Sequence, residues 1–227
     1  MKNIKVGNWN FFEIITFSFI IVFVITNAIV KQDNPVALIS AICGITYTVI
    51  AGKGHPVCYI FGLCGSGLYS YLAYQNSLWG NLALYSCYYI PMQILGYIRW
   101  NKNLKTDSKE IIKINLPKKE LGQVLLFSLC GVIALSFFLF KLEDAHPILD
   151  SITAVFSIAG MYLTVRRAIE QWLFWMVVNG LSFVMWLMVA TSGVKVYSTV
   201  IMWGVYLILA FYFYFTWHKE IKESNFE

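Results

Sequence analysis

The sequence predicts an all-α membrane protein that crosses the bilayer several times. Hydrophobic residues make up 59% of the 227 residues and charged residues only 13%, about half the charged share of an ordinary soluble domain. The apolar residues form uninterrupted runs close to the roughly 20 residues that a spanning helix needs. Lipid offers no partner to a bare backbone amide, so such runs must be helical, and β-barrel alternation is absent. A soluble enzyme, a disordered chain, a secreted disulfide scaffold and a nucleic-acid-binding protein are excluded.

Eight candidate spans follow one another along the chain. They cover residues 12–30, 36–51, 56–74, 79–98, 121–140, 148–165, 172–190 and 196–215. With this count, fourteen Lys and Arg residues lie on the side of the two termini and only three on the other side. Cytoplasmic loops retain basic residues. We therefore expect both termini to be cytoplasmic.

The long polar connection at 101–120 separates two similar halves of the chain. A shift of 116 residues brings Gly44 and Thr48 onto Gly160 and Thr164, and a shift of 117 aligns the aromatic ends of the two halves. Three helices recur as three helices, with one unpaired span between them. That single crossing gives both triplets the same polarity, so the repeats are parallel. Transporters of this plan hold their substrate near mid-membrane between the repeats.

The predicted architecture is therefore one extra N-terminal helix plus three, one and three helices. Its segments are an N-terminal extra transmembrane helix (1–34), a first three-helix repeat (35–100), a cytoplasmic polar linker (101–120), a central connecting helix (121–146), a second three-helix repeat (147–218) and a cytoplasmic tail (219–227).

Ionisable side chains are missing where membrane chemistry would need them. No predicted span carries a charge in its middle third, and all three histidines lie at span ends. Proton relays, carboxylate sodium sites and intramembrane proteases depend on such groups. The five cysteines show no spacing typical of metal ligands. We expect no enzyme activity, no metal and no cofactor, which leaves passive movement of a solute. A receptor or assembly subunit is the alternative from another class.

Aromatic rings and neutral amides take the place of charges. In the span 172–190, Trp175, Asn179, Phe183 and Trp186 follow steps of three and four residues and share one helix face. An amide beside an indole can stack a flat ring and hydrogen-bond its substituents. The alternative interpretation places Asn179 between two helices as a polar contact, and Trp172 and Trp186 in the interfacial aromatic belt.

The span 79–98 offers the second set of candidates. They are Trp79, Asn81, Tyr85, Tyr88, Tyr89, Met92 and Gln93, and the 117-residue shift adds Tyr206 as the counterpart of Tyr89. Pro91 lacks an N–H, so it should kink this helix and free the carbonyl of Cys87. The small residues Gly62, Ser66 and Ser70 are better explained by close helix packing than by a site.

These features resemble a known family. The run QWLFWMVVN from Gln171 to Asn179, the ending GYIRW at Trp100 and the three-one-three order are similar to the PnuC family of bacterial vitamin transporters, most closely those for nicotinamide riboside. The resemblance covers about residues 36–218. It implies facilitated diffusion of an NAD precursor across the bacterial inner membrane, with phosphorylation inside the cell preventing its return. It further implies a core like that of SWEET sugar transporters, in one full-length chain, and homotrimers.

The resemblance also implies a binding chemistry. Nicotinamide riboside carries a cationic pyridinium ring, which Trp and Tyr faces attract. Its amide and hydroxyls suit Asn179, Gln93 and Asn81. Relatives that carry thiamin or riboflavin share the resemblance, and a sugar is a further alternative.

Overall fold

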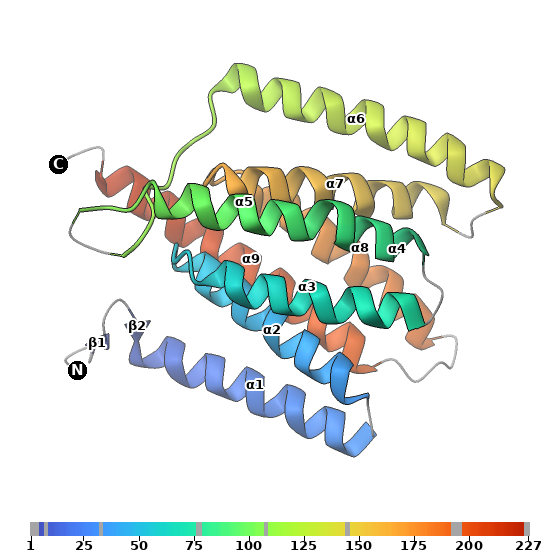
Figure 1. Ribbon diagram of the computed structural model, residues 1–227, viewed down its shortest axis with the longest axis horizontal. Coiled ribbons are helices and arrows are strands. Elements are labelled where there is room, and N and C mark those ends of the chain that lie inside the picture. Colours follow the sequence, from blue (N-terminus) through green and yellow to red (C-terminus); the bar gives the residue numbers. More distant parts are fainter. Residues whose placement is uncertain are drawn as a thin grey trace. The chain divides into compact units, whose positions relative to one another are not determined.

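The structure is a computed structural model, and it describes residues 5–6, 9–31, 34–75, 79–106, 109–143, 146–191 and 197–224. The chain divides into two compact units, Met1–Ile98 and Arg99–Glu227, and each is described by itself. A minimal antiparallel hairpin, β1 (Lys5–Val6) and β2 (Trp9–Asn10), precedes the helices (Figure 1). The helices are α1 (Phe11–Lys31), α2 (Pro35–Gly52), α3 (Cys58–Gln75), α4 (Trp79–Leu84), the π-helix η1 (Tyr85–Tyr89), α5 (Ile90–Asn101), α6 (Lys118–Lys141), α7 (Pro147–Val165), α8 (Gln171–Thr191) and α9 (Tyr197–Ser224).

Each of the eight predicted spans is helical over its described residues, except that Pro56 and Val57 belong to the turn before α3. Among the described residues, six helices are long and apolar enough to cross a membrane, namely α1, α2, α6, α7, α8 and α9. Glycine, serine and tyrosine lower the hydropathy of α3, and the π-helix η1 interrupts the run from α4 to α5. The expected all-helical, multi-pass class is thus confirmed.

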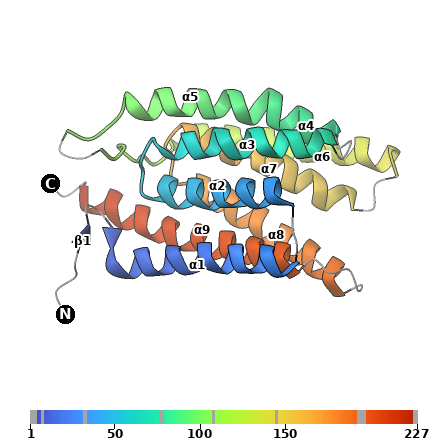
Figure 2. The ribbon, with the colours of Figure 1, turned by 60° about the horizontal axis from the view of Figure 1, so that its bottom comes forward.

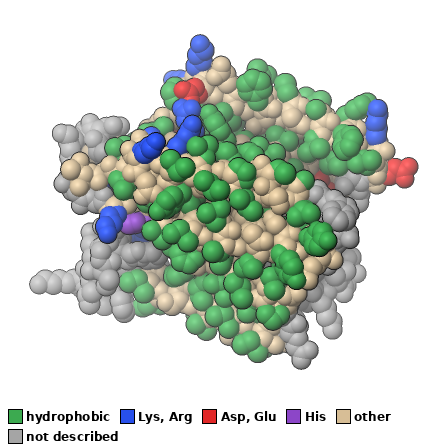
Figure 3. Space-filling view, viewed as in Figure 1, with side chains coloured by type: hydrophobic (Ala, Val, Ile, Leu, Met, Phe, Trp, Pro, Cys, Tyr) green, Lys and Arg blue, Asp and Glu red, His purple; other side chains and the backbone are tan. Residues whose placement is uncertain are grey.

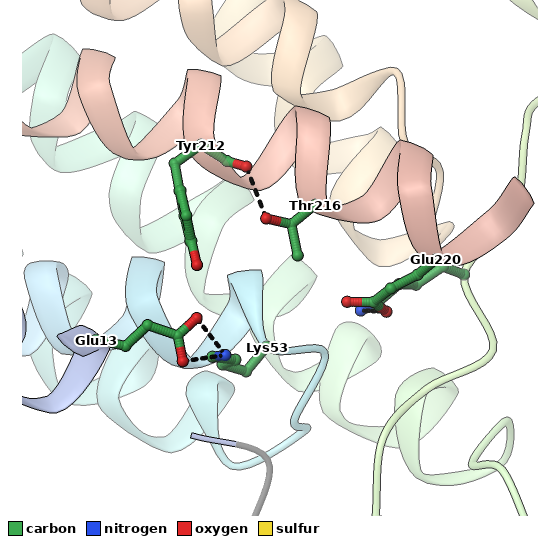
Figure 4. Close-up of polar contacts among 6 residues, drawn as sticks. Glu13, Lys53, Tyr212, Thr216 and Glu220 are labelled. Atoms are coloured by element: carbon green, nitrogen blue, oxygen red, sulfur yellow. Dashed lines mark hydrogen bonds and ion pairs between the residues drawn. The ribbon is translucent and has the colours of Figure 1, made fainter. Parts of the chain in front are cut away.

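In the first unit, α2 packs along α3 (Figure 2). The side chain of Asn34 accepts a hydrogen bond from the Val36 amide at 2.8 Å and so caps the start of α2. Small residues allow the two helices to approach closely. The Ser40 hydroxyl of α2 donates to the Gly65 carbonyl of α3 at 3.1 Å. An ion pair also holds α1 to the end of α2. Lys53 Nζ donates to both Glu13 carboxylate oxygens at 2.6 Å (Figure 4).

In the second unit, α6 packs on α7, α7 on α8 and α8 on α9. The buried side of α6 is made of small residues, since Ser128 and Ser136 are buried and a Cβ on Gly131 would lie 3.2 Å from Val155 of α7. Most of its large apolar side chains face outward, and Phe127 is 73% exposed. Leu121 and Val124 at its start pack on the core of this unit. Figure 3 shows hydrophobic side chains across the visible face, with charged ones near its edges. This pattern is what a lipid-facing surface requires.

The polar connection before α6 is fixed to the rest of the second unit. Ile111 is fully buried, and Ile114 pairs in a parallel bridge with Ala168 in the α7–α8 turn. Lys113, 3% exposed, forms an ion pair with Glu220 of α9. Burial lowers the pKa of Lys113 below its ordinary value, although Glu220 opposes this effect. The predicted linker is therefore an ordered part of this unit in its described residues.

The α2–α3 turn and the α7–α8 turn have the same backbone geometry. Each contains a residue with left-handed backbone, Gly54 at φ 74° and Arg167 at φ 63°. In both turns the amide of this residue bonds the carbonyl three positions back, and the next amide bonds the carbonyl five positions back, at 2.9 to 3.2 Å. Corresponding residues differ by 113 positions, as 54 and 167 do, and the helix starts Pro35 and Pro147 differ by 112. The 116-residue shift from Gly44 and Thr48 to Gly160 and Thr164 stays a prediction, and in both helices the threonine hydroxyl donates to the carbonyl of that glycine, at 3.0 and 2.8 Å.

Candidate functional site

The predicted site residues divide between the two units. Trp175, Asn179, Phe183 and Trp186 lie on α8 and Tyr206 on α9, in the second unit. The others lie on α4, η1 and α5, in the first unit. Among the described residues, no cluster of three His, Cys, Asp or Glu side chains could hold a metal ion.

The indole of Trp175 is held in place by α7. It packs on Gly160, where an added Cβ would lie 3.2 Å from Trp175 Cε2. Trp175 Nε1 donates to Thr164 Oγ1 at 3.2 Å, and that hydroxyl donates to the Gly160 carbonyl at 2.8 Å. Trp175 remains half-buried. One ring face is therefore packed, and the ring orientation is set by a hydrogen bond to α7.

Asn179 lies one turn further along α8. Its side chain is only 6% exposed, yet it makes no hydrogen bond with any described residue. Its carboxamide atoms are not among the fully enclosed side-chain atoms that lack a partner. Its two donors and its acceptor can therefore bind a polar group. The pair of Trp175 and Asn179 thus offers a positioned aromatic ring beside an amide that is free to bind a polar group.

The remaining candidates of the second unit are Phe183, Tyr206 and Trp186. A Cβ on Gly204 would lie 3.5 Å from the Phe183 ring, so this ring covers the glycine. Tyr206 makes an edge contact with Trp203 of its own helix at 5.9 Å between ring centroids. Trp186 is half-buried. These three residues supply aromatic surface and carry no observed polar contact to the Trp175 and Asn179 pair.

Trp172 is packed against α9. It is 3% exposed, its ring lies tilted against Phe213 at 5.3 Å between centroids, and it meets Trp217 edge to face at 5.6 Å. Two aromatic residues some 40 positions later in the chain therefore bury it, and its place in an interfacial aromatic belt stays a prediction.

In the first unit, Pro91 is preceded by a change in helix type. The five residues of η1 form a π-helix, in which the Ile90 amide bonds the Tyr85 carbonyl five positions back. The missing N–H of Pro91 is accommodated by this wider turn. Its tyrosines cluster, with Tyr85 4.3 Å from Tyr69 of α3 and 4.8 Å from Tyr89 between ring centroids. Tyr88 lies 5.6 Å from Tyr89. Such π-turns are frequent at functional sites.

Gln93 reaches into the small-residue stripe of α3. Its Nε2 donates to Ser66 Oγ at 3.0 Å, while its Oε1 is buried and has no hydrogen-bond partner in the described structure. A Cβ on Gly62 would lie 1.8 Å from Oε1, so only glycine leaves room for this side chain. The packing interpretation of the stripe is correct for Gly62 but incomplete for Ser66, which holds a candidate site residue. The hydroxyls of Ser66 and Ser70, four residues apart, were the sequence signal that could have indicated a polar partner on this helix.

Three candidates add little to this geometry. Met92 is half-buried and makes no polar contact that the structure records. Trp79 and Asn81 stand in the first turn of α4, and their side chains lie outside the described part of the structure. Their proposed contacts stay predictions.

These long apolar helices, with aromatic and carboxamide groups buried among them, define a multi-pass membrane protein. The model of the nicotinamide mononucleotide transporter family matches residues 34–219, and the chain belongs to this family. The match begins after α1, in agreement with the expectation that the first helix lies outside the shared core.

Individual relatives agree with this assignment. The nicotinamide riboside transporter PnuC of Neisseria mucosa is 31% identical, over 96% of this chain and 85% of that protein. The protein of the same name from Haemophilus influenzae is 27% identical, over 99% of this chain and 97% of its own length. A crystal structure described as the vitamin B3 transporter PnuC superposes with a TM-score of 0.81 at 29% identity, covering 95% of this chain and 94% of that one.

Proposed function

We propose that this protein carries nicotinamide riboside across the membrane by facilitated diffusion. Two of the relatives above are named as transporters of this compound. The observation that carries the proposal for this chain is the carboxamide of Asn179, which bonds no described residue, on the same helix face as the oriented indole of Trp175. A ligand with a flat ring and an amide substituent satisfies both groups at once.

The charge of the ligand suits such a neutral site. A pyridinium ring is attracted to a Trp face by about 0.5–2 kcal/mol, more when it is desolvated. The site therefore needs no carboxylate to bind a cation. Gln93 Oε1, buried without a partner, is a second acceptor that suits an amide or a ribose hydroxyl.

The passive mode of transport is supported by the absence of coupling groups in the helices named next. The helices α2, α7 and α8 contain no Asp, Glu, Lys or Arg beyond Asp150 in the first turn of α7. A protein without ionisable groups in these helices has no means there of coupling solute to a proton. Net uptake then requires removal of the free solute, which phosphorylation inside the cell would accomplish.

The three-one-three arrangement of parallel repeats belongs to the same proposal. The identical hydrogen bonds of the α2–α3 and α7–α8 turns support it. Counting 113 residues from α3 to α8 relates Gly62 to Trp175 and Ser66 to Asn179. The residues that hold Gln93 thus occupy the same helix positions as the proposed site pair. Eight crossings, cytoplasmic termini, a bacterial inner-membrane location and a homotrimeric, SWEET-like assembly complete the proposal.

Uptake by proteoliposomes tests the function. Vesicles containing the purified protein should accumulate labelled nicotinamide riboside in a saturable manner, and an excess of unlabelled compound should compete. Asn179→Ala should raise KM or abolish uptake, because it removes the amide. Asn27→Ala is the matched control, since Asn27 of α1 bonds its own helix at Phe23 O. Normal uptake by Asn179→Ala would overturn the assignment of this site.

Competition identifies the substrate class. Thiamin, riboflavin and glucose should compete poorly if nicotinamide riboside is the substrate. Stronger competition by one of them would transfer the proposal to that compound. No uptake of any of the four, by protein that is folded and inserted, would favour a receptor or assembly subunit.

A further inference from the structure

Three arginines line a cavity in the second unit. The cavity measures about 230 Å³ and is lined by Arg99, Asn103, Val165, Arg166 and Arg167. Arg99 and Asn103 come from the end of α5 and the turn after it, and the other three from the end of α7 and the turn toward α8. We call it the arginine pocket. It shares no residue with the candidate substrate-binding residues.

Buried contacts hold the two walls of the arginine pocket together. Trp100 is fully buried, and its Nε1 donates to the Thr164 carbonyl at 2.9 Å, which fixes the end of α5 against the end of α7. The connection before α6 links the two walls through Ile112. Its amide donates to the Asn103 carbonyl, and its carbonyl accepts from Arg167 Nη1, both at 2.9 Å. The pocket is therefore built by tertiary contacts.

The positive charge of the arginine pocket exceeds what the described residues around it neutralise. Arg166 Nη2 pairs with Glu120 at 2.6 Å. Arg99 and Arg167 form no ion pair with any residue that the structure describes. Burial lowers the pKa of Arg167, and the nearby charges of Arg166 and Arg99 lower it further. Counted over the described residues, three cations and one paired carboxylate leave an excess of two positive charges, while the C-terminal dipole of a helix offers only about half a negative charge.

The backbone of Arg167 is kept in a costly conformation. Its φ of 63° lies in the left-handed region, which disfavours any residue with a side chain. The Arg167 amide bonds the Thr164 carbonyl at 2.9 Å, and the Ile114 amide bonds the Arg167 carbonyl at 3.1 Å. These bonds hold its backbone in place, and its side chain lines the pocket. The equivalent position in the first unit is a glycine, Gly54, so the turn itself does not require an arginine.

We propose that the arginine pocket binds the phosphate group of an anionic ligand. A phosphate monoester carries a charge of about −1.5 to −2 at neutral pH, which matches the excess of two positive charges. The planar guanidinium groups present paired N–H donors that fit phosphate oxygens. Arg99 is exposed, so the ligand reaches the pocket from outside the protein. Either a soluble phosphate ester or a lipid headgroup supplies this chemistry. The site is independent of the transported compound.

Two binding measurements on the full-length protein test the proposal and separate the sources. In neutral detergent, inorganic phosphate and AMP are titrated at constant ionic strength with chloride as the balancing anion, and binding is followed by equilibrium dialysis. In phosphatidylcholine nanodiscs, Tm is compared with and without phosphatidylglycerol. Saturable binding in the first experiment assigns a soluble ester, and a Tm rise only in the second assigns a lipid.

Variants decide whether the arginines are responsible. Arg99→Gln should weaken the response about tenfold or more, since it removes a charged hydrogen-bond donor. Arg99 is exposed, so this variant keeps the fold, and Arg99→Gln/Arg167→Gln should abolish the response. Lys102→Gln removes the same charge from an exposed residue outside the pocket and should change nothing. The proposal is overturned by absence of binding in both experiments, or by equal responses of Arg99→Gln and wild type.

Discussion

Replacing Gly62 by alanine should force the Gln93 carboxamide away from Ser66. The new Cβ would lie 1.8 Å from Gln93 Oε1, whereas ordinary contacts begin at about 3.4 Å. The amide must withdraw by about 1.6 Å, which breaks its 3.0 Å hydrogen bond to Ser66. A hydrogen bond between membrane helices contributes about 0.6 kcal/mol, and a buried amide left unsatisfied costs about 1–3 kcal/mol. Alanine returns up to about 1 kcal/mol through helix propensity, so a net loss of about 1–2 kcal/mol is expected.

The free energy of unfolding in mixed micelles of dodecyl maltoside and SDS, followed by tryptophan fluorescence, measures this loss. Gly67→Ala on the same helix is the matched control, because no atom lies within 4 Å of its added Cβ. In a Gln93→Ala background the cost of Gly62→Ala should vanish, since the clashing group is gone. Equal stability of the Gly62→Ala and Gly67→Ala variants, or an unchanged cost in that background, would refute the packing of Gln93 on Gly62.

Three further predictions concern the second unit. Gly160→Ala should shift the Trp175 ring by a few tenths of an ångström and raise KM for uptake about 2- to 10-fold, whereas Gly180→Ala, with its nearest atom at 3.9 Å, should leave KM unchanged. Glu220→Gln should lower the free energy of unfolding by about 1–3 kcal/mol, because it deprives the buried Lys113 charge of its partner; an unchanged unfolding curve would contradict the pair. Since burial lowers the pKa of Lys113, the unfolded chain binds the proton more tightly, and stability should rise with pH just below 10.5; a rise that persists in Lys113→Met would have another cause.

The periodicity of a helix explains what the sequence could predict. Trp175 and Asn179 share a face because α8 has 3.6 residues per turn, and this spacing is readable without a structure. The apolar runs predicted eight helices by a second local rule, since each helix satisfies its own backbone hydrogen bonds in lipid. Local rules of this kind need no knowledge of neighbouring segments.

Tertiary contacts explain what the sequence could not predict. Ser66 becomes the partner of Gln93 only because a residue 27 positions later reaches it. Trp172 is buried by α9 and not by its own helix. The π-helix before Pro91 is one of several ways to absorb a missing N–H, and the sequence does not choose among them.

A few identities do not fix the alignment of the two repeats. The shift of 116 matches Gly44 to Gly160, two small residues that many helix contacts would accept. The turns at Gly54 and Arg167, where the backbone leaves the helical region, differ by 113 positions. Only one of these two residues is glycine, so residue identity alone gave no signal there.

Downhill movement of nicotinamide riboside through this chain is tested most directly by the end point of uptake. Proteoliposomes with the same buffer inside and outside are given labelled compound, and an ionophore collapses the membrane potential. In separate experiments a proton gradient or a sodium gradient is imposed. The internal concentration should reach the external one in the absence of a membrane potential and should not change with either ion gradient. Accumulation above the external concentration that depends on a proton or sodium gradient would contradict facilitated diffusion.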